Sequence, residues 1–336
     1  MILVTGGTGL VGSHLLFDLV RSGEKVRALK RENSSVELVK KIFSIYSADA
    51  ESLLNRVEWI TGDVTDIYSL YEAMQDVEKV YHAAAVVSFH ASDCNEMMKI
   101  NIDGTANVVN ACLHQKIKKL CFVSSIATLG RNDNEELIDE ETHWKNSNAN
   151  SAYSISKYGA EREVWRGIAE GLPAVIVNPS VIIGPGDWKQ GSSQLFQQVW
   201  KGLRYYTHGM NGYVDVRDVV KCMIQLMESE IENSPFIISS ENLDYLDLFG
   251  MIAEGLGKKK PSVQANAFLS QIAWRAESLR AKLTGKKPLI TKETARTAFQ
   301  RYQYTTEKIK NAIGIEFIPM KQSIQENCRQ FLKERL

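Results

Sequence analysis

The sequence lacks the residues that mark several classes of protein. Only five of its 336 residues are cysteine, and they are scattered, odd in number and without a Cys-x-x-Cys pair. This pattern argues against a disulfide framework or a zinc site and favours a reducing compartment, so we expect a cytoplasmic protein. The six histidines share no metal-ligand spacing, and we expect no metal.

An excess of charge and long apolar runs are also missing. The 40 basic residues balance the 40 acidic residues, which gives no support for nucleic-acid binding. No stretch approaches 18 uninterrupted apolar residues, and no basic segment with a long apolar core precedes the first glycine, so we expect neither a membrane span nor a secretory signal. No Gly-x-Ser-x-Gly elbow supports a hydrolase. The apolar share of 44% is ordinary for a globular protein.

Buried-strand patterns alternate with helix patterns through the first half of the chain. Strands are predicted over residues 2–5, 25–29, 57–61, 79–83, 119–124 and 174–178. Helices are predicted over residues 10–22, 67–74, 95–115 and 152–170. This alternation predicts an α/β fold with a doubly wound parallel sheet, the Rossmann arrangement.

The second half is less regular. A helix is predicted over 216–229, a strand over 236–239, and mostly helices after residue 240, at 246–256, 267–283, 291–300, 305–312 and 320–335. We expect a dinucleotide-binding domain of residues 1–178 and 213–240, and a smaller, mostly helical substrate-binding region of residues 179–212 and 241–336. The helix over 267–283 has one apolar face, which suits packing on its own domain, a substrate lid, a subunit contact or a membrane surface.

A glycine-rich segment separates the first strand from the first helix. Gly6, Gly9 and Gly12 follow the spacing Gly-x-x-Gly-x-x-Gly. Glycines at such a turn let the backbone approach a pyrophosphate closely, and the helix N-terminus then faces the phosphates. The alternative is a glycine-rich turn without a ligand. The order strand, loop, helix, strand favours the dinucleotide loop.

The end of the second strand indicates which dinucleotide is bound. An acidic residue there usually holds the ribose 2′-hydroxyl of NAD, whereas this sequence has Arg27, Lys30 and Arg31. These side chains favour binding of the 2′-phosphate of NADP, and NAD is the alternative cofactor. A third interpretation is that they are ordinary solvated surface charges without a ligand. Asp63, just after the third strand, suits either the adenine edge or a plain turn.

Tyr153 and Lys157 lie four residues apart in a predicted helix, which places both on one face. A phenol beside an ammonium can move a proton. Ser124 and Ser125 end the fifth strand, where hydroxyl groups reach the ligand crevice of an open α/β sheet.

Further motifs extend this pattern. They are His82-Ala-Ala-Ala85, Asn101-x-x-Gly104-Thr105, Asn178-Pro-Ser-Val-Ile-Ile-Gly-Pro-Gly186 and Gly212-Tyr-Val-Asp-Val-Arg-Asp218. Together with the glycine loop, the two serines and Tyr153-x-x-x-Lys157, they resemble the extended short-chain dehydrogenase/reductase family, which includes epimerases and dehydratases. The resemblance covers about residues 1–240. Val86–Phe89, Asn178-Pro179 and the basic strand end are most similar to its dihydroflavonol-reductase-like members.

The resemblance implies roles for these residues. Tyr153 would exchange a proton with the substrate oxygen, and Lys157 would favour the phenolate and bind the nicotinamide ribose. Ser125 would polarise the carbonyl, with Ser124 as the competitor for that role. The expected catalytic residues are Ser125, Tyr153 and Lys157. The expected cofactor-binding residues are Gly6, Thr8, Gly9, Leu10, Val11, Gly12, Arg27, Lys30, Arg31, Asp63, Val64, Ala83, Ala84, Ala85, Asn101, Ser124, Tyr153, Lys157, Pro179 and Val181.

The resemblance therefore implies an oxidoreductase that transfers hydride between NADP(H) and a carbonyl/secondary-alcohol pair. One alternative is a nucleotide-sugar epimerase or dehydratase with tightly bound NAD. Another is a dinucleotide-binding regulator without turnover, against which the complete Ser125, Tyr153 and Lys157 set argues. The expected partners are a small-molecule substrate and a second copy of the chain in a homodimer. Asp218 is expected to brace a helix, and the histidines are expected to be structural.

Overall fold

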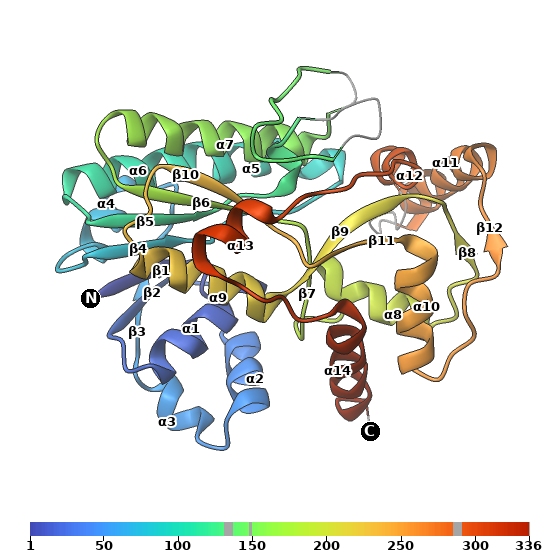
Figure 1. Ribbon diagram of the computed structural model, residues 1–336, viewed down its shortest axis with the longest axis horizontal. Helices are drawn as coiled ribbons and strands as arrows, with labels where there is room; N and C mark the ends of the chain where they lie inside the picture. The colour runs from blue at the N-terminus through green and yellow to red at the C-terminus, as the bar shows by residue number, and fades with distance from the viewer. Residues whose placement is uncertain (131–136, 148–149, 285–290, 336) are drawn as a thin grey trace.

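A parallel sheet forms the centre of the protein (Figure 1). The computed structural model describes residues 1–130, 137–147, 150–284 and 291–335. Within these residues the sheet has seven strands in the order β10-β6-β5-β4-β1-β2-β3, and every neighbouring pair is parallel. The strands are β1 (Ile2–Thr5), β2 (Val26–Lys30), β3 (Val57–Thr61), β4 (Lys79–His82), β5 (Lys119–Val123), β6 (Ala174–Pro179) and β10 (Ser234–Ile238). The predicted doubly wound fold is confirmed.

Helices cover both faces of this sheet because successive strand side chains point to opposite faces. On one face, Leu3, Val80 and Phe122 pack among the helices α4 (Ile67–Ala73), α6 (Gly104–His114) and α7 (Ala152–Ala169). On the other face, Val4 and Tyr81 pack with α1 (Leu10–Arg21) and α9 (Val216–Glu228). The helices α2 (Glu37–Tyr46) and α3 (Ala50–Leu54) extend this second layer.

Two parts of the first half differ from the predicted pattern. The helix predicted over 95–115 is divided into α5 (Cys94–Met98), a π-helical turn at Lys99–Asp103 and α6. The helices α2 and α3 were not predicted. No side chain caps the start of either helix, so the usual signal of a helix beginning is missing from the sequence.

The remaining segments build a smaller region beside the sheet (Figure 1). A second sheet has the order β11-β9-β7, with β7 (Val181–Ile183), β9 (Met210–Asp215) and β11 (Glu241–Asp244), and β8 (Tyr205–Tyr206) pairs with β12 (Val263–Gln264). The helices there are α8 (Gln194–Trp200), α10 (Tyr245–Gly255), α11 (Ala267–Thr284), α12 (Lys292–Thr297) and α14 (Met320–Lys333), whereas α13 (Glu307–Ile313) packs on β10 and α9 of the main sheet. The short strands interrupt a region that periodicity predicts as mostly helical. On α11, Phe268 and Ile272 are exposed, so this part of the apolar face is not packed.

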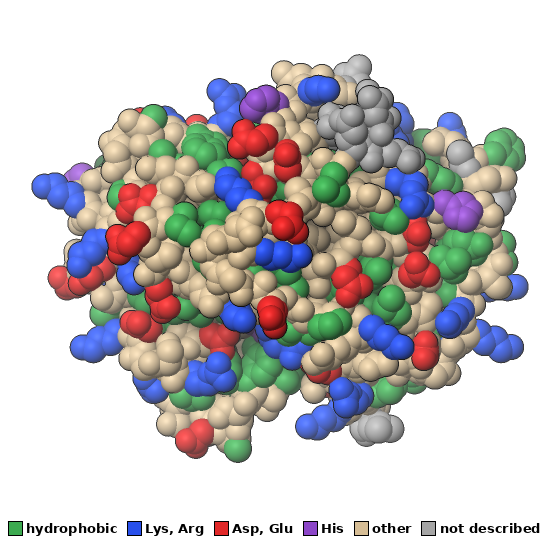
Figure 2. Space-filling view, viewed as in Figure 1, with side chains coloured by type: hydrophobic (Ala, Val, Ile, Leu, Met, Phe, Trp, Pro, Cys, Tyr) green, Lys and Arg blue, Asp and Glu red, His purple; other side chains and the backbone are tan. Residues whose placement is uncertain are grey.

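The face of the protein in Figure 2 shows no large area of one charge among the described residues. Figure 2 shows acidic and basic side chains interspersed over the visible face, in line with the zero net charge. None of the described helices combines the length and apolar character needed to span a bilayer.

Buried carboxylates fasten the C-terminal segment to α9. Asp215 caps α9 through the backbone N–H of Arg217 and accepts a hydrogen bond of 2.6 Å from Ser323 Oγ. Asp218 Oδ2 accepts a hydrogen bond of 2.8 Å from the backbone N–H of Ile318. The expectation that Asp218 braces local structure is confirmed. Burial raises the pKa of Asp218 from 3.8 to about 6, and the hydrogen bond from Ile318 opposes this shift.

Asp218 makes the stability of the protein depend on pH. Because its pKa is raised in the folded state, the folded protein keeps a proton that the unfolded chain releases between about pH 4 and 6. The stability contributed by the protonated form is present below pH 4 and is lost as the pH rises through 6. We expect Asp218→Asn, which keeps an acceptor for Ile318, to unfold at a higher temperature than wild type above pH 7.

The gain should be about 1–3 kcal/mol above pH 7 and should shrink towards pH 4, as measured by thermal unfolding at a series of pH values. Asp49→Asn, at an exposed position before α3, is the matched control and should show no such trend. A pH-independent difference between Asp218→Asn and wild type would contradict this account.

Candidate active site

The glycine loop crosses the carboxyl end of β1, where the sheet order reverses between β1 and β4. Gly6 has φ +73°, and a Cβ there would lie 2.5 Å from the backbone of Ala83 and Ala84. A Cβ on Gly12 would lie 2.1 Å from the carbonyl oxygen of Gly6. Both positions therefore need glycine, one for its backbone conformation and both for the close approach of two backbones. No side chain caps α1, so the N–H groups at its start are free to bind a phosphate, and the loop fits a dinucleotide.

A buried hydrogen-bond chain holds the end of β4 beside this loop. Thr105 Oγ1 donates to the carbonyl of Asn101 at 2.6 Å, so at 3.0 Å it accepts from His82 Nε2. His82 Nδ1 then accepts from Thr5 Oγ1 at 2.7 Å. Burial, with a smaller contribution from the positive charge of Lys157, lowers the pKa of His82 to about 3. His82 is thus a neutral structural link, as expected from the sequence.

Tyr153 lies in the first turn of α7, which Ser151 caps by accepting a hydrogen bond from the Ser154 backbone. Burial raises the pKa of the Tyr153 phenol above its ordinary value, and a hydrogen bond with Ser125 opposes this shift. The ring of Phe89 meets the Tyr153 ring edge to face, with centroids 5.8 Å apart. The phenol therefore lies between a hydroxyl and an apolar ring.

The two serines at the end of β5 point in different directions. Ser124 Oγ donates to Glu161 Oε2 at 2.5 Å and is buried. Ser125 accepts a hydrogen bond from the Ala127 backbone, and it is the serine whose hydroxyl acts to lower the pKa of the Tyr153 phenol. Only Ser125 is therefore placed beside the phenol, which favours Ser125 over Ser124 for polarising a carbonyl.

Lys157 follows Tyr153 by one helical turn and is almost completely buried. Its ammonium donates to the carbonyl of Val123 at 2.7 Å and lies 4.5 Å from the ring centroid of Phe122. Burial lowers the pKa of Lys157 to about 8, while the carboxylate of Glu161 acts in the opposite direction. A cation next to Tyr153 favours the phenolate, so the pair can hold and release a proton.

The three basic residues predicted for a 2′-phosphate are not equivalent. Arg27 lies early in β2, and its guanidinium binds Glu58 at 2.8 Å and the carbonyls of Ala73 and Gln75 at 2.9 and 2.8 Å. This corrects the expectation for Arg27, because its donors are used within the protein at the far end of the strand. Lys30 and Arg31 lie at the carboxyl end of β2, and neither forms a salt bridge with an acid in the described part of the chain.

Two other predicted residues are held by internal contacts. Asp63 Oδ1 accepts from the Thr65 backbone N–H and hydroxyl, both at 2.8 Å, so it forms a turn at the carboxyl end of β3. The Asn101 amide is buried and binds the backbone of Val86 and the hydroxyl of Ser156. Asn101 thus joins the segment after β4 to α7, and its side chain does not need to touch a cofactor.

The other expected residues border the same edge of the sheet. Thr8, Gly9, Leu10 and Val11 lie in the loop and the first turn of α1. Val64 is buried against Gly104, Ala83–85 follow β4, and Pro179 and Val181 lie where β6 passes into β7. Glu161 was not predicted. Its position four residues after Lys157, on the same helical face, is the signal that could have identified it.

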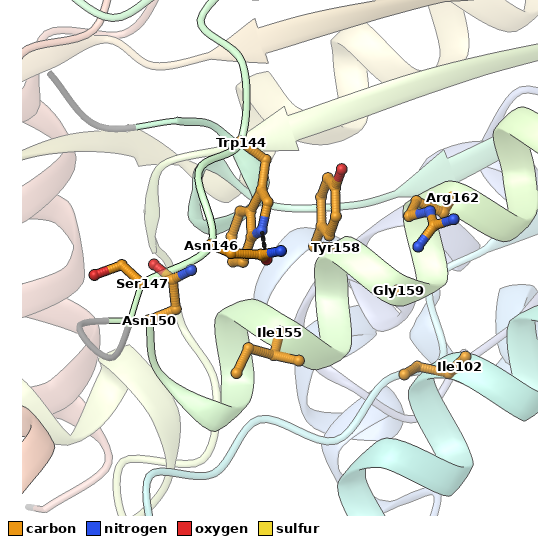
Figure 3. A pocket seen from close by; sticks show the side chains of 9 residues that line it. All are labelled: Ile102, Trp144, Asn146, Ser147, Asn150, Ile155, Tyr158, Gly159 and Arg162. Carbon is orange, nitrogen blue, oxygen red and sulfur yellow. Dashed lines mark hydrogen bonds between the residues drawn. The ribbon is translucent and has the colours of Figure 1, made fainter.

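A separate hollow of about 610 Å³ lies on the other side of α7 (Figure 3). Trp144 stacks on Tyr158 with ring centroids 4.4 Å apart, and Ile155 and Arg162 come from the same face of the helix. None of the expected catalytic or cofactor-binding residues lines this hollow. The candidate active site is therefore defined by the side chains at the carboxyl edge of the sheet.

Comparison with known sequences identifies the family. The NAD dependent epimerase/dehydratase family matches residues 2–238. Tetraketide alpha-pyrone reductase 2 of Arabidopsis thaliana is 31% identical and covers 71% of this chain and 77% of its own length. Cinnamoyl-CoA reductase 1 of Petunia hybrida is 24% identical and covers 98% of this chain and 91% of its own length.

Solved structures show the same fold. The crystal structure of gox2253 has a TM-score of 0.81 at 29% identity and covers 99% of this chain and 98% of its own. The UDP-glucose 4-epimerase of Thermotoga maritima, solved with UDP-glucose, has a TM-score of 0.78 at 20% identity, covering 100% of this chain and 99% of its own. The resemblance found in the sequence is thus confirmed: the chain belongs to the NAD dependent epimerase/dehydratase family and is an enzyme that uses a nicotinamide dinucleotide.

Proposed function

We propose that the enzyme is a reductase that transfers hydride between NADP(H) and a carbonyl/secondary-alcohol pair, with Tyr153 as the general acid and base. The observation that carries this proposal is the placement of Tyr153 and Lys157 one turn apart on α7, with the buried Lys157 ammonium donating at 2.7 Å to the carbonyl of Val123, two residues before Ser125 at the carboxyl edge of the sheet. Proton transfer needs a donor within hydrogen-bond reach of the reacting oxygen. These three side chains meet that need beside a loop that fits a dinucleotide.

Each side chain has a distinct part in the reduction. When bound, the dinucleotide supplies the hydride. Ser125 would hold the carbonyl oxygen next to the phenol. Tyr153 would donate its proton to that oxygen as negative charge develops there, and Lys157 would stabilise the phenolate that remains. In the direction of alcohol oxidation, the same phenolate would accept the proton.

Tyr153→Phe removes only the reacting hydroxyl. We expect kcat to fall by about 10²–10⁴-fold, because general acid catalysis contributes that much, while the NADPH dissociation constant stays within about twofold of wild type. Steady-state kinetics and fluorescence titration with NADPH measure the two quantities. Tyr158→Phe, on the opposite face of α7, is the matched control and should keep full activity. Retained turnover in Tyr153→Phe would remove Tyr153 from the mechanism.

The preference for NADP is proposed from Lys30 and Arg31. Both lie at the carboxyl end of β2, with no salt bridge to an acid among the described residues, and the first acid after the strand, Glu32, comes after both of them. A guanidinium can bind a phosphate with two parallel hydrogen bonds. NAD remains the alternative cofactor.

The substitution Arg31→Asp tests whether the protein prefers NADP over NAD. We expect the dissociation constant of NADPH to rise by about 10–100-fold, because a charge-assisted pair is lost and a like charge replaces it. The dissociation constant of NADH should change by less than about threefold. Arg56→Asp, at an exposed arginine just before β3, is the control for a change of surface charge. Equal effects of Arg31→Asp on both cofactors would refute the 2′-phosphate assignment.

The substrate is proposed to carry an apolar or aromatic body next to its carbonyl. Phe89 contacts Tyr153 yet remains 41% exposed, and Val87 beside it is more exposed still. Apolar side chains left open at a reacting group favour a substrate that covers them. The relatives named above are reductases, and the epimerase shares only the fold.

Phe89→Asn tests this substrate class. We expect kcat/KM for aromatic ketones and aldehydes to fall by about tenfold or more, because apolar contact area next to the carbonyl is lost. The assay compares a carbonyl panel with NADPH against UDP-glucose epimerisation with NAD. Tyr68→Asn, at an exposed aromatic on α4, is the matched control. Epimerisation of UDP-glucose by wild type, without reduction of any carbonyl, would support the epimerase alternative instead.

We further propose that residues 1–178 and 213–240 bind the dinucleotide, that residues 179–212 and 241–336 hold the substrate, and that the protein acts as a cytoplasmic homodimer. Ile155 and Trp165, exposed apolar side chains on α7, support a contact between two copies. The five free cysteines, all but Cys94 buried, suit a reducing compartment.

A further inference from the structure

A buried carboxylate lies directly behind the catalytic side chains. Glu161 follows Lys157 by one turn of α7 and is only 9% exposed. Its Oε2 lies 2.5 Å from Ser124 Oγ, 2.8 Å from Thr128 Oγ1 and 2.9 Å from Asn178 Nδ2. These polar groups come from the end of β5, the turn that follows it and the end of β6. One carboxylate therefore connects two separate chain segments, residues 124–128 and the end of β6, to α7.

The connected segments enclose Ser125. The Ser125 carbonyl accepts from Asn178 Nδ2 at 3.2 Å and lies 2.9 Å from Thr128 Oγ1, whose single proton is shared between this carbonyl and Glu161. Ser124, the preceding residue, donates to Glu161 directly. The backbone on both sides of Ser125 is therefore held through the same carboxylate. Loss of these contacts would allow the Ser125 hydroxyl to move away from Tyr153.

Glu161 is also the charge that balances Lys157. The Lys157 ammonium donates to the Val123 carbonyl and lies over the Phe122 ring of β5. Its charge acts on His82 of β4, and the charge of Glu161, one turn further along α7, acts on it. His82 is neutral and adds no charge beside Lys157. Among the described residues, Glu161 is the acid whose negative charge raises the pKa of Lys157. Its negative charge favours the protonated ammonium, and burial opposes it.

We propose that Glu161 is a positioning residue for the reaction, which holds Ser125 beside Tyr153 and keeps the ammonium of Lys157 charged. It does not touch the substrate. The inference rests on the proposed reductase chemistry. Glu161 has no part in the catalytic roles proposed above, and its proposed task is to support the side chains that transfer the proton.

Glu161→Gln removes the charge and keeps the size of the side chain. With the charge gone, Lys157 should lose its proton at lower pH, since Glu161 supplies the negative charge that opposes the effect of burial on the ammonium. We expect the alkaline limb of the pH profile of kcat/KM for carbonyl reduction to move down by about one pH unit. The loss of activity should be about tenfold above that limb and small near pH 6. Glu163→Gln removes a carboxylate of the same helix that pairs with Arg166, and should leave the profile unchanged.

Two outcomes would overturn the proposal: a wild-type profile in Glu161→Gln, or an equal loss at every pH with the limb in its original place. The second outcome would make Glu161 structural only. If Glu161→Gln does not fold, Glu161→Asp takes its place, because it keeps the charge but cannot reach all three partners. It should lower kcat several-fold without moving the limb, and a wild-type kcat would contradict the positioning role.

A measurement without turnover separates this inference from the proposed function. NMR titration of protein labelled with ¹³C at the lysine Cε, with Lys157 assigned from Lys157→Met, follows the ammonium directly. We expect Glu161→Gln, but not Glu163→Gln, to move the Lys157 titration to lower pH by about one unit. If wild type reduces no carbonyl, the reductase proposal fails, and an unmoved Lys157 titration would independently exclude Glu161 as its balancing charge.

Discussion

The buried ammonium of Lys157 constrains the whole carboxyl edge of the sheet. A charge removed from water is costly unless nearby groups compensate for it. Here a strand carbonyl, an aromatic ring and the carboxylate of Glu161 do so from β5 and α7. Because the helix must lie close to the strand for these contacts to form, Tyr153 in the preceding turn is brought beside Ser125. The burial of His82 and the nearby charge of Lys157 keep the His82 imidazole neutral, which fits its role as a link between Thr5 and Thr105.

The dinucleotide side of the site depends on a second constraint, the close approach of two backbones. Gly6 lies against the Ala83–Ala84 backbone, and Gly12 lies against the carbonyl of Gly6. Any larger side chain would separate β1, α1 and the end of β4. The uncapped N-terminus of α1 is then directed at the crevice where the sheet order reverses, which is where a phosphate binds in such folds. The proposed proton relay and the glycine loop thus meet at one edge of one sheet.

Several parts of this arrangement were predictable because they depend on local patterns. The strand and helix periods gave the alternation that makes a parallel sheet, and the glycine spacing located the phosphate loop. The spacing of Tyr153 and Lys157 was sufficient to put them on one helical face. The helices α2 and α3 were missed because no capping side chain marks their beginnings. The π-helical turn within the helix predicted over 95–115 was missed because a residue pattern does not report a local change in backbone hydrogen bonding.

The sequence by itself determined the fold class, the glycine loop and the pairing of Tyr153 with Lys157 on one helical face, since each follows from spacing along a single strand or helix. Only the tertiary structure favours Ser125 over Ser124 as the proposed partner of Tyr153, because adjacent residues at a strand end face opposite ways and Ser124 meets Glu161. Only the tertiary structure removed Arg27 from the phosphate-binding set, because its partners come from β3 and the end of α4. It also decided the place of Glu161, whose hydrogen-bond partners lie up to 37 residues away along the chain. Contacts between distant segments depend on how the elements pack, and no local period records them.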